Sequence, residues 1–242
     1  MYEVAAILSK RYRDFNHYNR KNPLDELLFI LCSVKRTEKV YLRAYRSLKK
    51  AFPRFEDLAE AKTKDLIKKV EWGGLQNQKA SSVKALIGAV IDTFGQLSLA
   101  KLKHLDDQEC EEFLLALPGV GKKVARCVML YSLERKMFPV DSHCWQIAAR
   151  LGWINSSGNN RNCSVRDMDR LQEMVPPDLR YSLHVNLVSL GREICTARKP
   201  RCRECVIFSF CRRIGAEEAC QAVAKACTPP NTKRKQQSNK LS

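Results

Sequence analysis

The sequence predicts an all-α protein, and three observations lead to that prediction. Apolar residues recur three or four positions apart through most of the chain, which is the period of an amphipathic helix. Proline and glycine residues separate these periodic stretches and mark the turns between helices. No segment alternates apolar and polar residues for long enough to form a sheet.

The expected helices can be placed in order along the chain. Val4, Leu8, Tyr12 and Phe15 share one face of an opening helix, and residues 24–34 form a strongly apolar helix that we expect to be buried. Later periodic stretches cover residues 40–52, 63–71, 80–94, 109–117, 122–133, 142–151, 167–174 and 180–191. The residues that punctuate them are Pro53, Gly73, Gly74, Gly95 and Pro139.

Charge points to a polyanionic partner. The 242 residues include 43 Lys or Arg against 26 Asp or Glu, a net charge of +17, and 45% of them are hydrophobic. The length and the apolar fraction allow one large or two medium domains with proper cores. A surplus of this size attracts polyanions at long range, so nucleic acid is the expected partner, although a basic surface can also serve solubility alone.

The cysteines and the N-terminus indicate in which cellular compartment the protein works. The chain has eleven cysteines, an odd number, and outside one cluster they are not regularly spaced. No stretch resembles an export signal or a membrane span. Disulfide frameworks need an oxidising compartment. We therefore expect a reduced, intracellular (cytoplasmic or nucleoid), soluble protein without membrane association.

Four cysteines near the C-terminus form the most informative motif. They follow the spacing C-x6-C-x2-C-x5-C and are Cys195, Cys202, Cys205 and Cys211. Structural zinc sites usually combine two short ligand pairs, and only one such pair is present here. Four thiolates with these unequal gaps favour a [4Fe–4S] cluster. A zinc knuckle or a set of buried free cysteines is the alternative.

A short turn, LPGVG at residues 117–121, joins two predicted helices. Glycines permit positive φ and close backbone approach, and the free N–H groups at the start of the next helix form an anion site. A DNA phosphate fits that site, and an ordinary tight turn is the alternative.

Lys122 and Lys123 follow the turn, and spacing alone does not show which of them is the nucleophile. The helix N-terminus and neighbouring cations are expected to lower the pKa of Lys123 and favour its nucleophilic neutral amine.

Asp141 precedes the apolar helix that starts at residue 142. Its simplest role is to cap that helix. A carboxylate held by helix amides also stays ionised and can stabilise positive charge on a sugar.

Two segments differ in composition from the rest. Residues 156–162 (SSGNNRN) form a polar loop with strong turn chemistry. Residues 217–242 are polar and basic with a Pro-Pro break, which is typical of a mobile tail.

In four features the chain resembles endonuclease III, the iron–sulfur branch of the helix–hairpin–helix DNA glycosylases. These features are LPGVGKKVA (117–125), VDSH (140–143), the cysteine spacing and GGLQNQKA (73–80). The resemblance implies a two-lobed, all-α fold. One lobe would be a helical barrel, residues 16–135, which carries the hairpin. The other would join residues 1–15 to residues 136–216 and hold the [4Fe–4S] cluster.

The resemblance also implies a reaction. A damaged nucleotide of double-stranded DNA would be flipped into the cleft between the lobes. Lys123 would attack the sugar C1′ and displace the base, with support from Asp141, and a Schiff base would then lead to β-elimination at the abasic site. Oxidised pyrimidines are the expected lesions, and a monomer is the expected state. The residues expected to contact DNA are Gly119, Gly121, Lys122, Lys35, Asn77, Arg198 and Lys199.

Two positions qualify the resemblance. Leu31 stands where adenine glycosylases of this branch carry a glutamate, which argues against adenine excision. Lys35 stands where the family normally has a glutamine that fills the gap left by the flipped base. Lys35 leaves a second interpretation open, in which the chain is a weakly catalytic or non-catalytic binder of damaged or distorted DNA.

Overall fold

The computed structural model describes residues 1–34, 36–155 and 163–216, and within these ranges the chain is helical with no strand. This confirms the predicted all-α class. In chain order the elements are α1 (Tyr2–Tyr12), α2 (Pro23–Ser33), α3 (Glu38–Ala51), α4 (Phe55–Glu60), α5 (Thr63–Lys69), α6 (Gln76–Phe94), η1 (Ala100–His104), α7 (Asp107–Ala116), α8 (Lys122–Tyr131), α9 (Ser142–Leu151), α10 (Val165–Met174), α11 (Arg180–Glu193), η2 (Cys202–Glu204) and η3 (Phe208–Phe210).

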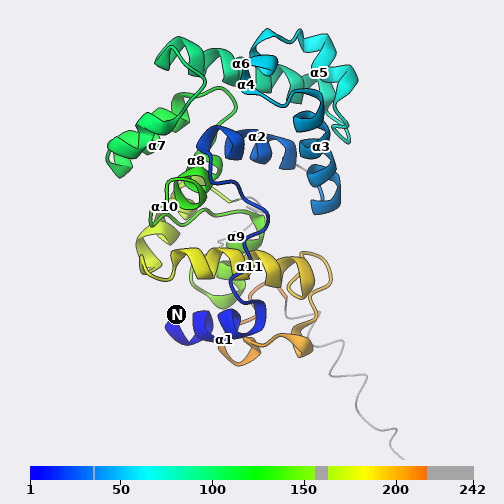
Figure 1. Cartoon of the computed structure of the whole chain (residues 1–242). Helices are drawn as coiled ribbons and strands as arrows, with labels where there is room; N and C mark the ends of the chain where they lie inside the picture. The colour runs from blue at the N-terminus through cyan, green and yellow to red at the C-terminus, as the bar shows by residue number, and fades with distance from the viewer. Residues whose placement is uncertain (35, 156–162, 217–242) are drawn as a thin grey trace, which may run out of the picture.

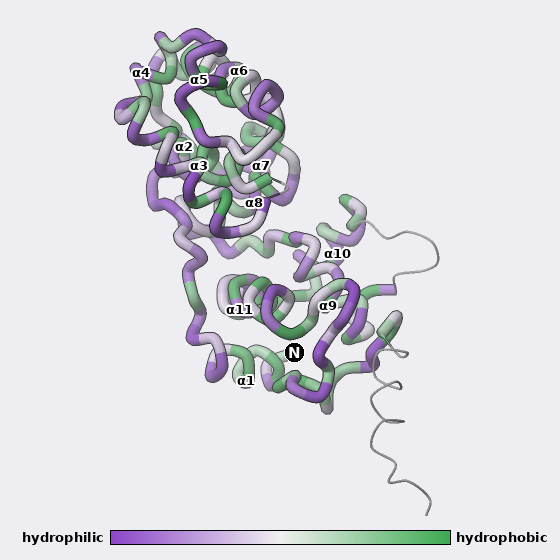
Figure 2. Tube along the Cα trace, turned by 90° about the vertical axis from the view of Figure 1, so that its right-hand side faces the viewer, coloured by the Kyte–Doolittle hydropathy of each residue, from purple (hydrophilic) through white to green (hydrophobic). Residues whose placement is uncertain are grey.

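The described helices form two lobes, each with its own hydrophobic core (Figure 1). The hairpin lobe contains α2 to α8. The cysteine lobe unites α1 with α9 to α11 and the loop that follows α11. Figure 2 shows the lobes as separate bodies joined by connecting segments. The two-lobed arrangement expected from the sequence is therefore present.

Helix α2 is the centre of the hairpin lobe because it is apolar on nearly every side. Asn22 caps its start by accepting hydrogen bonds from the N–H groups of Leu24 and Asp25, at 3.0 and 3.1 Å. At its other end the buried Lys79 amine donates to the carbonyl of Cys32, at 2.7 Å. A cation at that carbonyl end also suits the helix dipole. Both ends of a buried helix are thus satisfied by side chains.

The lobes meet where α8 lies beside α10, and an ionic cluster joins them. Arg126 is buried on α8 and binds Glu111 of α7 at 2.7 Å and Asp169 of α10 at 2.5 Å. Lys122 binds the same Asp169 at 2.7 Å. This cluster is therefore one of the contacts that hold the hairpin against the cysteine lobe.

Arg126→Met is expected to destabilise the protein by about 3 kcal/mol, because it leaves the carboxylate of Glu111 without its buried partner. Arg11→Met is the matched control, since Arg11 and Glu193 form an exposed pair with side chains 48% and 40% accessible; its effect should stay within about 1 kcal/mol. Urea unfolding of both variants tests this. Equal effects would show that the Arg126 cluster contributes no more than a surface pair.

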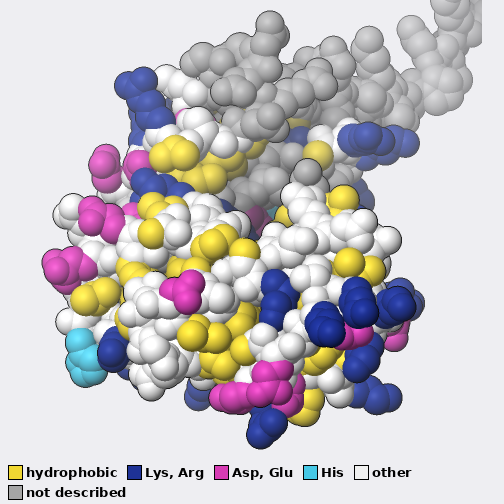
Figure 3. Space-filling model, turned by 90° about the horizontal axis from the view of Figure 1, so that it is seen from above, with side chains coloured by type: hydrophobic (Ala, Val, Ile, Leu, Met, Phe, Trp, Pro, Cys, Tyr) yellow, Lys and Arg dark blue, Asp and Glu magenta, His cyan; other side chains and the backbone are white. Residues whose placement is uncertain are grey.

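Charge is unevenly distributed over the hairpin lobe. Figure 3 shows Lys and Arg side chains gathered along one side of the end of this lobe. Helix α3 contributes an exposed basic row whose members are Lys39, Arg43, Arg46 and Lys50. Within the described ranges, none of the helices has the length and apolar character needed to cross a membrane.

Candidate active site

The hairpin turn sits between α7 and α8 and is anchored by its apolar residues. Leu117 and Val120 are buried, while Gly119 and Gly121 are exposed. Gly119 has φ +78°, which favours glycine, whereas Gly121 caps α8 in an ordinary extended conformation with φ −97°. Only the first glycine is therefore required by backbone geometry. The exposed turn leaves the first N–H groups of α8 accessible.

Helix α8 directs Lys122 and Lys123 to different sides, which distinguishes the two lysines between which sequence spacing did not choose. Lys122 points toward α10, and its amine is bound by both oxygens of Asp169, at 2.7 and 2.8 Å. Lys123 lines a cavity instead, together with Asp141. The amine of Lys122 is paired with a carboxylate in this structure, and the phosphate contact expected of it stays a prediction.

Asp141 performs the capping role that the sequence suggested and also faces the cavity. Its Oδ1 accepts a hydrogen bond from the N–H of Cys144 at 2.8 Å, at the start of α9. The same side chain lines the cavity beside Lys123. Capping fixes the carboxylate in one orientation, and this orientation places it next to the amine.

The cavity has an outer chamber of about 650 Å³ and an inner chamber of about 70 Å³. Both chambers are lined by residues from four helices and one helix cap, namely Ser33, Tyr41, Lys123, Asp141 and Arg192. Aromatic and apolar side chains dominate the rest of the inner chamber, which is lined by His17, Asn19, Phe29, Ile30, Cys127, Tyr131, His184 and Val188. The smaller chamber therefore combines aromatic and apolar side chains with the polar groups of Lys123 and Asp141.

The charge state of Lys123 differs from the sequence-based expectation. Burial alone would lower the pKa of Lys123, but Cys127 and Asp141 raise it by more, so the net shift is upward. The expected lowering is therefore wrong in direction. The helix N-terminus was visible in the sequence, whereas the acidic groups that fold around the amine were not.

Two neighbours of Lys123 have shifted pKa values of their own. Burial opposes ionisation of Asp141, yet His184, Lys123 and the Cys144 N–H together lower its pKa, so the carboxylate is ionised at neutral pH. Burial lowers the pKa of His184 to about 4, so its imidazole is neutral there. Asp141 is therefore available to accept a proton.

Glu26 is a buried carboxylate behind this cavity that sequence reasoning missed. Its side chain is 0% exposed, and burial raises its pKa from 4.5 to about 7. The sequence offered no signal, because Glu26 lies in the first turn of α2, where acidic residues commonly face solvent.

The shifted pKa of Glu26 predicts a pH dependence of stability. Between about pH 4.5 and pH 7 the folded protein keeps a proton that the unfolded chain has lost, so stability falls as the pH rises through this window. The loss attributable to Glu26 is about 3 kcal/mol. Urea unfolding at pH 5 and pH 8 should show this loss in the wild type relative to Glu26→Gln. Parallel pH profiles for the two proteins would contradict the shift.

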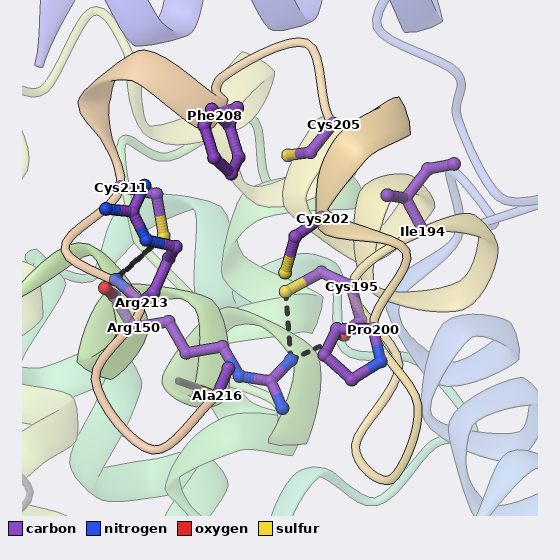
Figure 4. A pocket seen from close by; sticks show the side chains of 10 residues that line it. All are labelled: Arg150, Ile194, Cys195, Pro200, Cys202, Cys205, Phe208, Cys211, Arg213 and Ala216. Carbon is purple, nitrogen blue, oxygen red and sulfur yellow. Dashed lines mark hydrogen bonds between the residues drawn. The ribbon is translucent and has the colours of Figure 1, made fainter. Parts of the chain in front are cut away.

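The four predicted cluster ligands line one small space in the cysteine lobe (Figure 4). Cys195 follows α11, and Cys202, Cys205 and Cys211 lie on or beside the short helices η2 and η3. Among the described residues, no group of three or more His, Cys, Asp or Glu side chains has the geometry for a single metal ion.

A buried arginine fits an anionic cluster in this space. Arg150 is 7% exposed and donates to Cys195 Sγ at 3.0 Å and to the carbonyls of Thr196 and Ala197. The N–H of Arg213 lies 3.4 Å from Cys211 Sγ. A [4Fe–4S] cluster with four thiolates carries a net negative charge, so these donors suit it.

Cys205→Ser is expected to lose most of the bound iron and the brown colour, because one of four thiolate ligands is removed. Cys163→Ser should keep both, since Cys163 lies outside the ligand set. Iron and acid-labile sulfide analysis of the purified proteins measures this. A wild-type protein that holds zinc instead of iron would contradict the prediction.

The remaining predicted DNA contacts are spread over the surface. Asn77 is exposed in the first turn of α6, and Arg198 and Lys199 are exposed on the loop after α11. Lys35, the loop 156–162 and the tail 217–242 lie outside the described residues. Gly74 packs so closely on Arg36 that an added Cβ would meet its guanidinium at 2.3 Å. The GGLQNQKA motif therefore packs against Arg36, which lies between α2 and α3.

Comparison with known families agrees with this geometry. The model for HhH-GPD superfamily base excision DNA repair proteins matches residues 31–171, and the iron–sulfur binding domain of endonuclease III matches residues 195–211. The chain belongs to the endonuclease III family of HhH-GPD proteins. As a member of this family it carries a [4Fe–4S] cluster, which the four lining cysteines would hold.

Individual relatives of this HhH-GPD protein are distant. A putative DNA glycosylase of Arabidopsis thaliana, At3g47830, is 32% identical over 181 residues, which cover 75% of this chain and 60% of the relative. Endonuclease III of Thermotoga maritima is 26% identical and covers 89% and 95%. Protein ROS1A of Oryza sativa is 25% identical over 70% of this chain. The chain spans only 60% of the Arabidopsis protein and 9% of the rice protein.

Solved structures show the same fold. A non-covalent endonuclease III–DNA complex superposes with a TM-score of 0.76 at 20% identity, covering 91% of this chain and 96% of that one. A thermostable thymine-DNA glycosylase gives a TM-score of 0.73 at 22% identity, covering 89% and 94%. At these identities the likeness establishes the fold of the HhH-GPD protein.

Proposed function

We propose that this chain is a DNA glycosylase with lyase activity at abasic sites, acting on damaged one-ring bases in double-stranded DNA. The observation that carries the proposal is the cavity that Lys123 and Asp141 line together. An amine nucleophile, an ionised carboxylate and an apolar chamber for one ring are the groups that the reaction needs. We expect oxidised pyrimidines as the substrates, because the inner chamber is small.

Base release begins with the flipped nucleotide in the cavity. Because the pKa of Lys123 is raised, its ammonium proton must first leave, and the Asp141 carboxylate is the acceptor in the same cavity. Lys123 Nζ then forms a bond to the sugar C1′. The bond from C1′ to the base breaks, the electron pair leaves with the base, and the base takes up the proton.

Strand cleavage follows from the same covalent bond. The sugar ring opens to give an imine between C1′ and Lys123. Loss of a proton from C2′ drives β-elimination, which breaks the bond from C3′ to its oxygen and releases the 3′ phosphate. Water then hydrolyses the imine and frees the lysine. Lys123 supplies the electrophilic cation that makes the C2′ proton acidic.

Borohydride trapping on a duplex with one abasic site tests the proposal. Reduction of the imine should produce a stable protein–DNA adduct, and mass analysis of its peptides should locate the DNA on Lys123. An adduct on Lys122 would move the nucleophile to the other lysine. Absence of any adduct at saturating protein would refute the lyase.

One feature of the sequence keeps a different function open. Lys35 stands where the family normally has the glutamine that fills the gap left by the flipped base. The chain would then recognise damaged or distorted DNA without cleaving it. Tight binding of an abasic duplex with no adduct and no base release would support this second function.

A further inference from the structure

Behind the inner chamber, Glu26 is held by two donors from the segment that joins α1 to α2. One carboxylate oxygen accepts from the backbone N–H of Arg20 at 2.6 Å. The other accepts a short hydrogen bond from Nδ2 of Asn19. A carboxylate is costly to bury, so a carboxylate with no exposed surface at this position suggests a purpose beyond packing.

Asn19 connects this buried carboxylate to the chamber. Asn19 is one of the residues that line the inner chamber with Lys123 and Asp141. Its Oδ1 is buried, and among the described residues this oxygen has no hydrogen-bond partner. Above about pH 7, where Glu26 is ionised, its carboxylate can only accept, so it holds the Nδ2 side of the Asn19 amide and turns Oδ1 away from itself. A buried oxygen without a donor is unfavourable until a ligand supplies one.

We propose that Asn19 Oδ1 accepts a hydrogen bond from the ring N–H of the flipped base, and that Glu26 is the positioning residue that fixes the orientation of the Asn19 amide. The inference rests on the proposed glycosylase function and names its substrate class. The favoured bases are damaged pyrimidines of the uracil and thymine type, which carry an N–H at ring position 3. Cytosine-type lesions present a bare acceptor nitrogen at that position, which the amide oxygen repels.

Replacing Glu26 with glutamine makes the orientation testable. The glutamine carbonyl can still accept from the Arg20 N–H, so its NH₂ group faces Asn19. That NH₂ group can only donate, which turns the Asn19 amide so that Oδ1 meets it and Nδ2 faces the chamber. The chamber then offers a donor in place of an acceptor. A purely structural Glu26 would not predict a reversal of base preference.

The probes are 5-hydroxyuracil and 5-hydroxycytosine, each placed opposite guanine in the same duplex. These two lesions differ only at the edge of the ring that carries position 3. Single-turnover base release at pH 8, where Glu26 is ionised, should favour 5-hydroxyuracil by about tenfold or more in the wild type. Glu26→Gln should shift the ratio toward 5-hydroxycytosine by about tenfold or more, and Asn19→Leu should reduce the discrimination to about threefold or less. Cleavage of an abasic duplex, which has no base to recognise, measures any effect of either variant on Lys123 itself, and such an effect changes both base-release rates alike and leaves their ratio unchanged.

The outcomes separate this inference from the proposed function. Base ratios that are unchanged in both variants would overturn the role of Asn19 and Glu26, while abasic cleavage would still support the lyase. Loss of abasic cleavage in the wild type would refute the lyase instead. In that case base preference is measured by binding instead, with duplexes that carry the same two bases on a 2′-fluorinated sugar, which resists base release. The ratio of the two affinities then replaces the ratio of the two rates. An affinity ratio that is the same in Glu26→Gln as in the wild type would overturn the inference.

Discussion

Lys123→Gln is expected to reduce strand cleavage at abasic sites by a factor of roughly a thousand or more and to eliminate the borohydride adduct. Glutamine keeps much of the length and polarity of the lysine but cannot form an imine. Because Lys123 lines both chambers of the cavity, the substitution leaves the apolar core of α8 in place. Single-turnover cleavage and adduct yield measure the effect.

Lys122→Gln is the matched control, one position earlier on the same helix. Its amine is bound to Asp169 and does not line the cavity, so activity should stay within about fivefold of the wild type while stability falls by about 1 kcal/mol. A large loss of cleavage in Lys122→Gln with an active Lys123→Gln would reverse the assignment.

Wild-type cleavage should also rise with pH above neutrality, since the pKa of Lys123 is raised.

Asp141→Asn is expected to slow base release by a factor of roughly 10² to 10⁴, because the amide cannot accept the lysine proton or stabilise positive charge on the sugar. Asparagine caps helices about as well as aspartate, so the start of α9 should persist. DNA affinity and the free energy of unfolding should therefore change little, by about 1 kcal/mol at most. Single-turnover kinetics and urea unfolding measure the two effects separately.

Asp141→Ala removes the cap as well as the charge and serves as the comparison. It should lose about 1 kcal/mol more stability than Asp141→Asn, with a similar loss of base release. If base release in the two variants instead followed their stability, Asp141 would be a structural cap only.

The sequence by itself determined the features that depend on neighbouring residues along the chain. The spacing of Cys195 to Cys211 predicted one cluster site, and the helical periodicity predicted an all-α fold. The LPGVG turn and the Asp141 cap are equally local, since each involves a few consecutive residues. For such features the distance between groups is set by the backbone, so sequence spacing is sufficient.

Only the tertiary structure decided which charges meet. Lys122 and Lys123 are adjacent in sequence, yet Asp169 of α10 binds one of them, while Cys127 and Asp141 raise the pKa of the other. The pairing of Asn19 with Glu26 likewise depends on how the segment after α1 returns to α2. The sign of a pKa shift and the orientation of an amide follow from groups that folding brings together from distant elements, and no local pattern records those distances.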